Sequence, residues 1–213
     1  MCGRYVITKP LSKTKGMVKY VVGVTDADNY NAHPTQKLPV LKNYTNGKTL
    51  EVLQWGLTPV WAQERNLKLL INARLETLKE KMSFKNLINE SRCVVLADGY
   101  YEWKVEENKK TPYYFTRKDN QTLFLAAIYK SHQFMLITRP ADSNIGTVHH
   151  RQPVIISAKD VDDYFNLEIE GTYFLISHKS PELKFHPVSK ALNKPSNNKK
   201  ELIDKLINRD EFN

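Results

Sequence analysis

The residue with the most distinctive chemistry is Cys2, which directly follows the initiator methionine Met1. Removal of Met1 would leave an α-amine and a thiol on one residue, with reference pKa values of about 7.7–8.0 and about 8.5. Such a 1,2-aminothiol attacks an aldehyde twice, because the amine forms a Schiff base and the sulfur then closes a five-membered thiazolidine ring. The competing interpretation is a small, unreactive residue at a frayed chain end, and position alone favours it.

Other polar side chains could assist such a reaction. Glu102 stands among aromatic residues, where apolar surroundings raise the pKa of a carboxyl group towards the range useful for proton transfer. His149 and His150 are adjacent, so in an extended segment only one of them would enter a site. Asn72 carries both a donor and an acceptor and could hold an amine. Each residue also has a purely structural interpretation. Glu102 could face water, the histidine could have all its hydrogen bonds within the fold, and Asn72 could cap a turn.

Arginine and tryptophan side chains accompany these candidates. Arg4, Arg74 and Arg151 each lie within two residues of one of them. Three converging guanidinium groups would suit the binding of phosphate. Trp61 and Trp103 could stack on nucleic-acid bases, although aromatic residues in a sheet more often belong to the core.

Metal and cofactor motifs are missing from the sequence. It has no His-Glu-x-x-His or Cys-x-x-Cys spacing, and its 8 glycines are scattered singly instead of forming a phosphate loop. Two cysteines, Cys2 and Cys93, are too few for a disulfide framework or a thiolate cluster. We therefore expect a reduced protein that uses no metal ion and no cofactor.

Composition and charge narrow the class of protein. The chain has 213 residues, 41% hydrophobic and 26% charged, enough for one well-buried core. It has no apolar run of the roughly 20 residues that span a membrane, and no signal-peptide core, so we expect a cytoplasmic protein without membrane contact. The net charge of +9 favours a polyanionic partner, most often nucleic acid, unless the lysines serve only solubility.

Hydrophobic patterning predicts many short strands and a few helices. Strands are expected at 3–8, 38–44, 49–57, 93–97, 100–105, 112–116, 122–128, 134–138, 153–156, 173–176 and 184–188. Helices are expected at 12–22, 76–81, 83–89, 157–165 and about 199–208, with a loop at 26–35. Asn46-Gly47 is a strong hairpin signal. The strands after Cys93 suggest an antiparallel meander. The predicted fold class is α+β, as one domain over 1–213 with a mostly antiparallel, curved, barrel-like sheet and flanking short helices.

Seven motifs occur in an order that resembles one family. They are Met1–Tyr5, Asn31–Gln36, Trp55–Ala62, Ile71–Thr77, Ala97–Trp103, His149–Ile155, and Pro187–Ser189 with Asn193. The set resembles the SRAP family, the SOS-response-associated peptidases or abasic-site processing proteins, over nearly the whole chain. Two departures concern local packing and remove no reactive group: Leu75 stands where alanine is usual and Gln152 where methionine is common.

The resemblance implies a role in the response to DNA damage. Family members bind single-stranded DNA, especially near junctions with duplex, and cross-link to the aldehyde of ring-opened abasic sites. Cys2 would form the thiazolidine after Met1 is removed, by self-cleavage or by an aminopeptidase. Asn72 would orient the amine, Glu102 would transfer protons, and His149 would assist sugar ring opening and a competing lyase reaction. The residues that would contact DNA are Arg4, Arg74, Arg151, Trp61 and Trp103.

Two other functions would use the same residues. Cys2 with His149 and Glu102 would also make a thiol peptidase or hydrolase with an amino-terminal nucleophile. A basic and aromatic surface alone would make a non-enzymatic binder of single-stranded DNA, with salt-sensitive affinity. We expect a monomer, associated with the nucleoid if the source is a bacterium.

Overall fold

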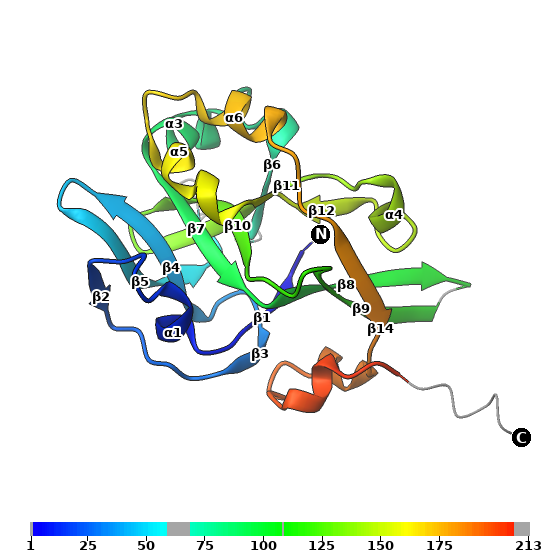
Figure 1. Ribbon diagram of the computed structural model, residues 1–213. Helices are drawn as coiled ribbons and strands as arrows, with labels where there is room; N and C mark the ends of the chain where they lie inside the picture. Colours follow the sequence, from blue (N-terminus) through cyan, green and yellow to red (C-terminus); the bar gives the residue numbers. More distant parts are fainter. Residues whose placement is uncertain (1, 59–68, 108, 207–213) are drawn as a thin grey trace, which may run out of the picture.

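The computed structural model describes residues 2–58, 69–107 and 109–206. Its strands form two sheets, which Figure 1 shows side by side with short helices around them. The smaller sheet has five antiparallel strands. In spatial order they are β14 (Leu183–Pro187), β9 (Lys109–Arg117), β8 (Gly99–Glu106), β1 (Arg4–Ile7) and β3 (Asn29–Ala32).

The larger sheet has nine strands and curls into a barrel. Its path is β12 (Arg151–Pro153), β11 (Gln133–Pro140), β10 (Leu123–Lys130), β7 (Arg92–Ala97), β4 (Lys37–Tyr44), β5 (Gly47–Trp55) and β2 (Tyr20–Val22). Beside this path, β13 (Ile155–Ile156) pairs with β10 and β6 (Asn72–Arg74) pairs with β11. Because β5 also pairs with β11, the strands β11, β10, β7, β4 and β5 form a closed ring.

Short helices lie around the two sheets. The α-helices are α1 (Pro10–Thr14), α3 (Met82–Glu90), α4 (Ser143–Gly146), α5 (Val161–Phe165) and α6 (Gly171–Ser177). The 3-10 helices are η1 (Leu75–Thr77), η2 (Ala158–Asp160), η3 (Lys190–Asn193) and η4 (Lys200–Ile203). In Figure 1, α3, α5 and α6 gather at one end of the molecule. Within the described ranges, no helix has both the length and the apolar character needed to cross a membrane.

The core joins the two sheets. All six residues of β7 are buried, as in a strand that is covered on both faces. Tyr5 of β1 packs against Trp55 of β5 with 5.2 Å between ring centroids, which attaches the start of the chain to the barrel. Gly99 allows close packing of β8 on β9, because a Cβ atom there would lie 2.4 Å from the Phe115 carbonyl oxygen. The start of β1 is therefore held firmly in place.

The α+β class and the mostly antiparallel, barrel-like sheet are confirmed. The predicted hairpin is confirmed as well, with β4 and β5 paired on either side of Asn46. The meander is wrong, because β7 pairs with β10 while β8 and β9 form a hairpin in the other sheet. This arrangement matters for the site, because it brings Glu102 of β8 beside β1.

Several element predictions are also wrong. The expected helix 12–22 ends at Thr14, and Tyr20–Val22 joins the ladder of β5 instead. The expected loop 26–35 contains β3, which pairs with β1. The expected strand 173–176 lies in helix α6, whose first turn is capped by the Glu170 carboxylate. The expected closing helix at about 199–208 is only the 3-10 turn η4 within the described residues.

Candidate active site

Strand pairing places the beginning of the chain beside Glu102. Arg4 and Tyr5 of β1 lie opposite Tyr101 and Tyr100 of β8, in antiparallel register. The chain before Arg4 therefore runs towards the Glu102 end of β8. Cys2 is fully buried there, so it is no part of a frayed chain end. Its thiol points back to the Arg4 carbonyl oxygen at 4.0 Å.

Asn72 reaches Cys2 from the larger sheet. It begins β6, which pairs with β11 opposite Leu136. The Asn72 Nδ2 atom donates a hydrogen bond to the Cys2 carbonyl oxygen at 2.9 Å. The Asn72 Oδ1 atom is buried and accepts no hydrogen bond from the residues that the structure describes. One side of this amide thus fixes the Cys2 backbone, while the other side presents an acceptor.

Glu102 and His149 form the acid–base part of the cluster. The Glu102 side chain is 2% exposed, and its Oε1 atom lies 3.7 Å from His149 Nδ1. Burial raises the pKa of Glu102 to about 7, although the positive charge at the amino terminus opposes this shift. Burial lowers the pKa of His149. Near neutral pH the carboxyl group can therefore give or take a proton, and the imidazole is mainly uncharged.

The two adjacent histidines have different surroundings. His149 is half-buried and faces Glu102, whereas His150 is exposed and lies beside it, with 4.5 Å between ring centroids and the ring planes tilted by 31°. The His149 Nδ1 atom lies 3.1 Å from the backbone nitrogen of Arg151, which donates to it. In the other neutral tautomer Nδ1 donates instead to the Arg151 carbonyl oxygen, which lies 3.2 Å away, so the Arg151 backbone holds the ring in both tautomers.

The pKa of the Cys2 thiol differs from that of a free cysteine. Burial, and secondarily the charge of Glu102, raises the pKa of the Cys2 thiol well above its usual range. The sulfur is therefore protonated near neutral pH, and its proton has to leave when a bond to sulfur forms. Glu102 is the nearby group whose pKa suits that transfer.

A pocket opens beside Glu102 and His149. It has a volume of about 440 Å³, and the other residues that line it are Trp103, Val105, Lys110 and Asn193. The Trp103 Nε1 atom donates to Asn193 Oδ1 at 2.9 Å, which links the strand to η3. No sequence motif indicates a role for Val105 or Lys110, which belong to the β8–β9 hairpin. Trp61 lies outside the described residues.

The three arginines have different surroundings. Arg4 donates to Asn31 Oδ1 at 2.8 Å, and Asn31 in turn donates to three carbonyl groups of residues 192–197. Arg74 is exposed, and its side chain has no hydrogen bond or ion pair among the described residues, although its backbone carbonyl accepts from the Thr77 hydroxyl at 3.4 Å. Arg151 does not match the expected free phosphate ligand. It is 6% exposed, it pairs with the Glu76 carboxylate through both terminal nitrogens, and it also donates to Thr138.

The pair of Arg151 and Glu76 gives a first prediction. Glu76→Gln would leave a buried guanidinium with a weaker partner, so we expect the free energy of unfolding to fall by about 1–3 kcal/mol. Denaturant unfolding measures this change. Glu80→Gln is the matched control, because Glu80 is exposed, and it should change stability by less than about 0.5 kcal/mol. Equal effects of the two substitutions would show that the ion pair of Glu76 with Arg151 does not stabilise the fold.

The raised pKa of Glu102 gives a second prediction. The folded protein holds this proton more tightly than the unfolded chain does, so the stability it contributes is complete below about pH 4.3 and is lost as the pH rises through about 7. Glu102→Gln keeps the group neutral, and we expect it to be more stable than wild type by about 2–4 kcal/mol above pH 7. Near pH 4 the two proteins should differ little. Thermal or urea unfolding between pH 4 and 8 tests this, and parallel curves for the two proteins would contradict it.

The described residues contain no group of three or more histidine, cysteine, aspartate or glutamate side chains that could hold a metal ion. The cluster at Cys2 offers one thiol, one carboxylate and one imidazole. They lie around the hydrogen bond from the Asn72 side-chain amide to the Cys2 carbonyl oxygen. It can therefore act as a nucleophile with a proton donor and acceptor.

Comparison with known proteins identifies the family of this chain. The family described as SOS response associated peptidase (SRAP) matches residues 1–195. The chain belongs to the SRAP family. SRAP relatives include the abasic site processing protein YedK of Escherichia coli, which is 33% identical over 82% of this chain and 83% of its own length. YoqW of Bacillus subtilis, also named an abasic site processing protein, is 30% identical over 83% of this chain and 85% of its own.

Solved structures share the fold of this chain. A protein of Bacteroides thetaiotaomicron superimposes with a TM-score of 0.82 and 22% identity, over 97% of this chain and 100% of its own. A phage-related protein of Bordetella bronchiseptica superimposes with a TM-score of 0.73 and 22% identity, over 89% of this chain and 95% of its own. At these identities the likeness concerns the fold.

Proposed function

We propose that this protein processes abasic sites in DNA by linking Cys2 covalently to the ring-opened sugar. The observation that carries the proposal is the buried cluster at the start of β1, in which Asn72 holds the Cys2 carbonyl at 2.9 Å beside Glu102 and His149. The names of the relatives YedK and YoqW support the same substrate. An aldehyde is the partner that a 1,2-aminothiol requires.

The reaction begins at the α-amine of Cys2, once Met1 has been removed. The amine adds to the sugar aldehyde, a carbon–nitrogen bond forms, and the carbonyl oxygen leaves as water after it has been protonated. Glu102 in its protonated form is suited to supply that proton, because its pKa of about 7 leaves a large fraction protonated near neutral pH. The buried Oδ1 atom of Asn72 can accept an N–H of the amine and so orient its lone pair.

Ring closure follows at the same carbon. The Cys2 sulfur adds to the carbon of the protonated Schiff base, and the thiol proton passes to Glu102, now a carboxylate, which is thereby returned to its protonated form. The product is a neutral thiazolidine, and atoms balance with the loss of one water. Neutral His149, whose ring is held by the Arg151 backbone, is suited to donate a proton to the sugar oxygen when the sugar ring opens. The same position would serve a lyase reaction that competes with ring closure.

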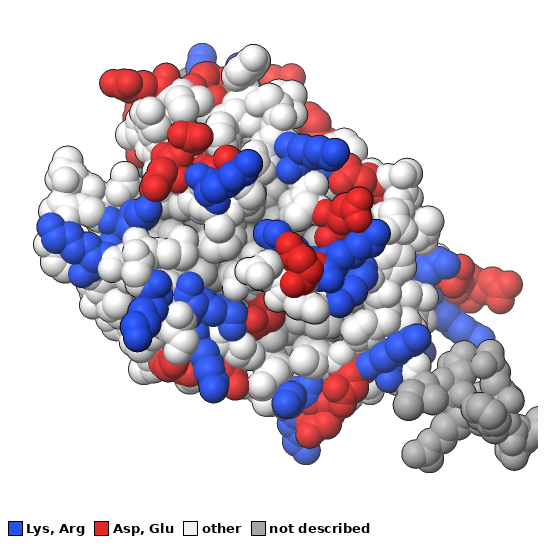
Figure 2. Space-filling view, in the orientation of Figure 1, with Lys and Arg blue, Asp and Glu red and all other residues white. Residues whose placement is uncertain are grey.

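DNA would approach along the pocket beside Glu102. Lys110 supplies positive charge in the lining of this pocket, and Trp103 supplies an aromatic surface. The exposed Arg74 follows Asn72 by two residues and would add a further positive charge near the site. Arg151 instead acts as a positioning residue, because its backbone amide holds His149 while its guanidinium is bound to Glu76. On the face shown in Figure 2, basic side chains lie beside acidic ones, so this face carries no broad, purely basic patch.

The contact of Arg74 with phosphate gives a third prediction. Arg74→Gln should weaken reversible binding of single-stranded DNA, and it should reduce the slope of log affinity against log salt by about 0.7, as expected for one lost phosphate contact. Fluorescence anisotropy over a range of salt concentrations measures both quantities. Lys130→Gln removes one exposed charge outside the site and serves as the control. An unchanged slope for Arg74→Gln would remove this residue from the interface.

Intact mass of the purified protein tests the proposed function directly. We expect the mature chain to lack Met1. After incubation with an oligonucleotide that contains one abasic site, we expect a gain equal to the oligonucleotide minus one water. A retained Met1 or an unchanged mass after incubation would refute the proposal. The Cys2 thiol is held protonated by burial, which argues against the alternative of a general thiol hydrolase that needs a ready thiolate.

A further inference from the structure

Asn31 of β3 connects the start of the chain to a segment 160 residues later in the sequence. The Asn31 side chain is buried, and its Oδ1 atom accepts a hydrogen bond from Arg4 Nη1 at 2.8 Å. Its Nδ2 atom donates to the carbonyl oxygens of Leu192, Lys194 and Asn197, at 3.2, 3.1 and 2.8 Å. One buried amide therefore joins β1, β3 and the segment that contains η3.

The three carbonyl groups decide which way the Asn31 amide faces. A carbonyl oxygen only accepts hydrogen bonds, so the nitrogen of the amide has to point to residues 192–197 and its oxygen to Arg4. The Leu192 and Lys194 carbonyls lie at the end of η3, where the last carbonyl groups of a helix have no partner within it. The Arg4 side chain is thereby held by an acceptor that is itself fixed.

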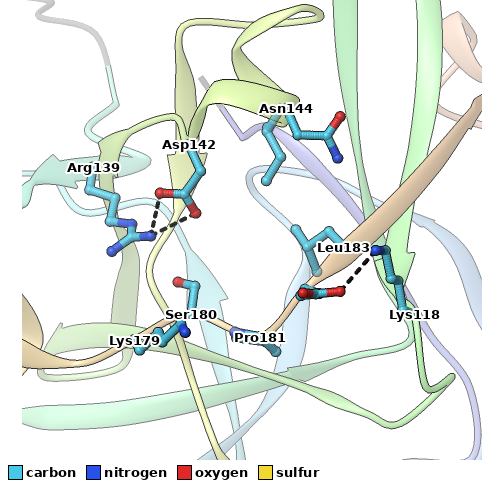
Figure 3. Close-up of a pocket in the computed structure, with 10 residues that line it drawn as sticks. Lys118, Arg139, Asp142, Asn144, Lys179, Ser180, Pro181 and Leu183 are labelled. Atoms are coloured by element: carbon cyan, nitrogen blue, oxygen red, sulfur yellow. Dashed lines mark hydrogen bonds and ion pairs between the residues drawn. The ribbon is translucent and has the colours of Figure 1, made fainter.

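The Arg4 guanidinium is oriented but not neutralised. The acceptor of its hydrogen bond is an uncharged amide, and Arg4 has no ion pair among the residues that the structure describes. Carboxylates pair with other arginines instead. Glu76 binds Arg151, and Figure 3 shows Arg139 donating to both oxygens of Asp142 in a pocket elsewhere on the molecule. Of these three arginines, Arg4 is the one whose positive charge is left for a ligand.

The position of Arg4 in the chain limits which ligand it could meet. Adjacent Cα atoms are about 3.8 Å apart, so the Cα atoms of Arg4 and Cys2 are separated by at most about 8 Å. When Cys2 is bonded to an abasic sugar, the anionic groups nearest to that sugar are the phosphates on either side of it. A guanidinium can give a phosphate two parallel hydrogen bonds, and Arg4 has nitrogens besides Nη1 to supply them.

We propose that Asn31 is a positioning residue, which presents the charged Arg4 side chain to a phosphate that flanks the abasic site. This inference rests on the function proposed above. The neutral amide is essential to it, because an acidic residue at the same place would hold Arg4 equally well but would take the charge that the phosphate needs.

Asn31→Asp tests this role through the salt dependence of reversible DNA binding. Aspartate keeps an acceptor beside Arg4 and adds the negative charge that the amide lacks. We expect the slope of log affinity against log salt to fall by about 0.7, the value of one phosphate contact. The probe is a single-stranded oligonucleotide with one tetrahydrofuran residue, an abasic analogue without an aldehyde, and fluorescence anisotropy measures the slope. Asn198→Asp is the matched control, because Asn198 accepts from the Tyr30 backbone at 2.6 Å and does not contact Arg4, so its slope should stay at the wild-type value.

A double-mutant cycle covers the case in which Asn31→Asp loosens the fold. Asn31→Ala should weaken the affinity for the same oligonucleotide about two- to tenfold, because an unsupported Arg4 side chain loses more freedom on binding. In an Arg4→Gln background the same substitution should cost less than about twofold, because Asn31 acts through Arg4. Equal losses in the two backgrounds would show a purely structural role and overturn the proposal.

The salt slopes give the remaining outcomes. A wild-type slope for Asn31→Asp, or an equal fall for Asn198→Asp, would contradict the proposal, and so would a wild-type protein that does not bind the oligonucleotide. No covalent bond forms with tetrahydrofuran, so these results do not depend on Cys2 chemistry. The function proposed for Cys2 fails on a different result, which is an unchanged intact mass after incubation with a true abasic site.

Discussion

Cys2→Ala should abolish the stable adduct with abasic single-stranded DNA, a loss of at least about 1000-fold, or on the order of 4 kcal/mol in the barrier. The alanine variant can still lose Met1 and present an α-amine, so it should still form a Schiff base. That intermediate hydrolyses on denaturation because no sulfur is present to close the ring. Denaturing electrophoresis should therefore show a wild-type adduct and none for the variant, while reversible DNA binding stays largely intact.

Two controls sharpen this experiment. Cys93 is also a fully buried cysteine, so Cys93→Ala matches the packing cost of Cys2→Ala and should leave the adduct unchanged. Addition of cyanoborohydride should trap the Schiff base of the Cys2→Ala variant, which would separate the role of the amine from that of the sulfur. A stable adduct of the variant without the reductant would exclude the thiazolidine mechanism.

Glu102→Gln should slow adduct formation by about 100- to 10 000-fold, the usual contribution of a positioned acid–base group. Glutamine cannot protonate the departing oxygen or accept the thiol proton, and the buried thiol of Cys2 holds its proton near neutral pH. The rate for wild type should depend on pH around about 7, where Glu102 titrates, and the variant should lose that dependence. Quenched time courses at several pH values measure both effects.

Glu106→Gln is the matched control for this prediction. Glu106 ends the same strand, but it is exposed and pairs with Lys104 at 2.7 Å. The control should cross-link at the wild-type rate and keep its pH profile. If Glu102→Gln cross-links as fast as Glu106→Gln, Glu102 has no part in the proton transfers, whatever its effect on stability.

Local patterns predicted the parts of the fold that depend on local forces. The hairpin around Asn46-Gly47 and the strands near Cys93 and Phe134 follow from turn chemistry and β propensity, which act over a few residues. The residues at 173–176 are apolar and look like a strand, yet a carboxylate from Glu170 caps them into helix α6. The parallel ladder of Tyr20–Val22 with β5 depends on a partner about 30 residues away, which a local window does not reveal.

Arg151 shows the same limit at the candidate site. Its place beside the histidines suggested a phosphate ligand. The guanidinium is instead buried against Glu76, a residue 75 positions earlier. A sequence lists charges without their partners, so it does not tell a free arginine from a paired one.

The sequence by itself determined which reactive groups the chain owns and, through the order of its motifs, the family to which it belongs. It also identified Cys2, whose chemistry depends on covalent structure and not on folding. Only the tertiary structure decided what surrounds that residue. Antiparallel pairing of β1 with β8 brings Glu102 to the chain start, and β6 brings Asn72 to the Cys2 carbonyl. Burial then shifts the pKa values of Cys2 and Glu102 upwards, because ionisation costs more free energy in a site that excludes water.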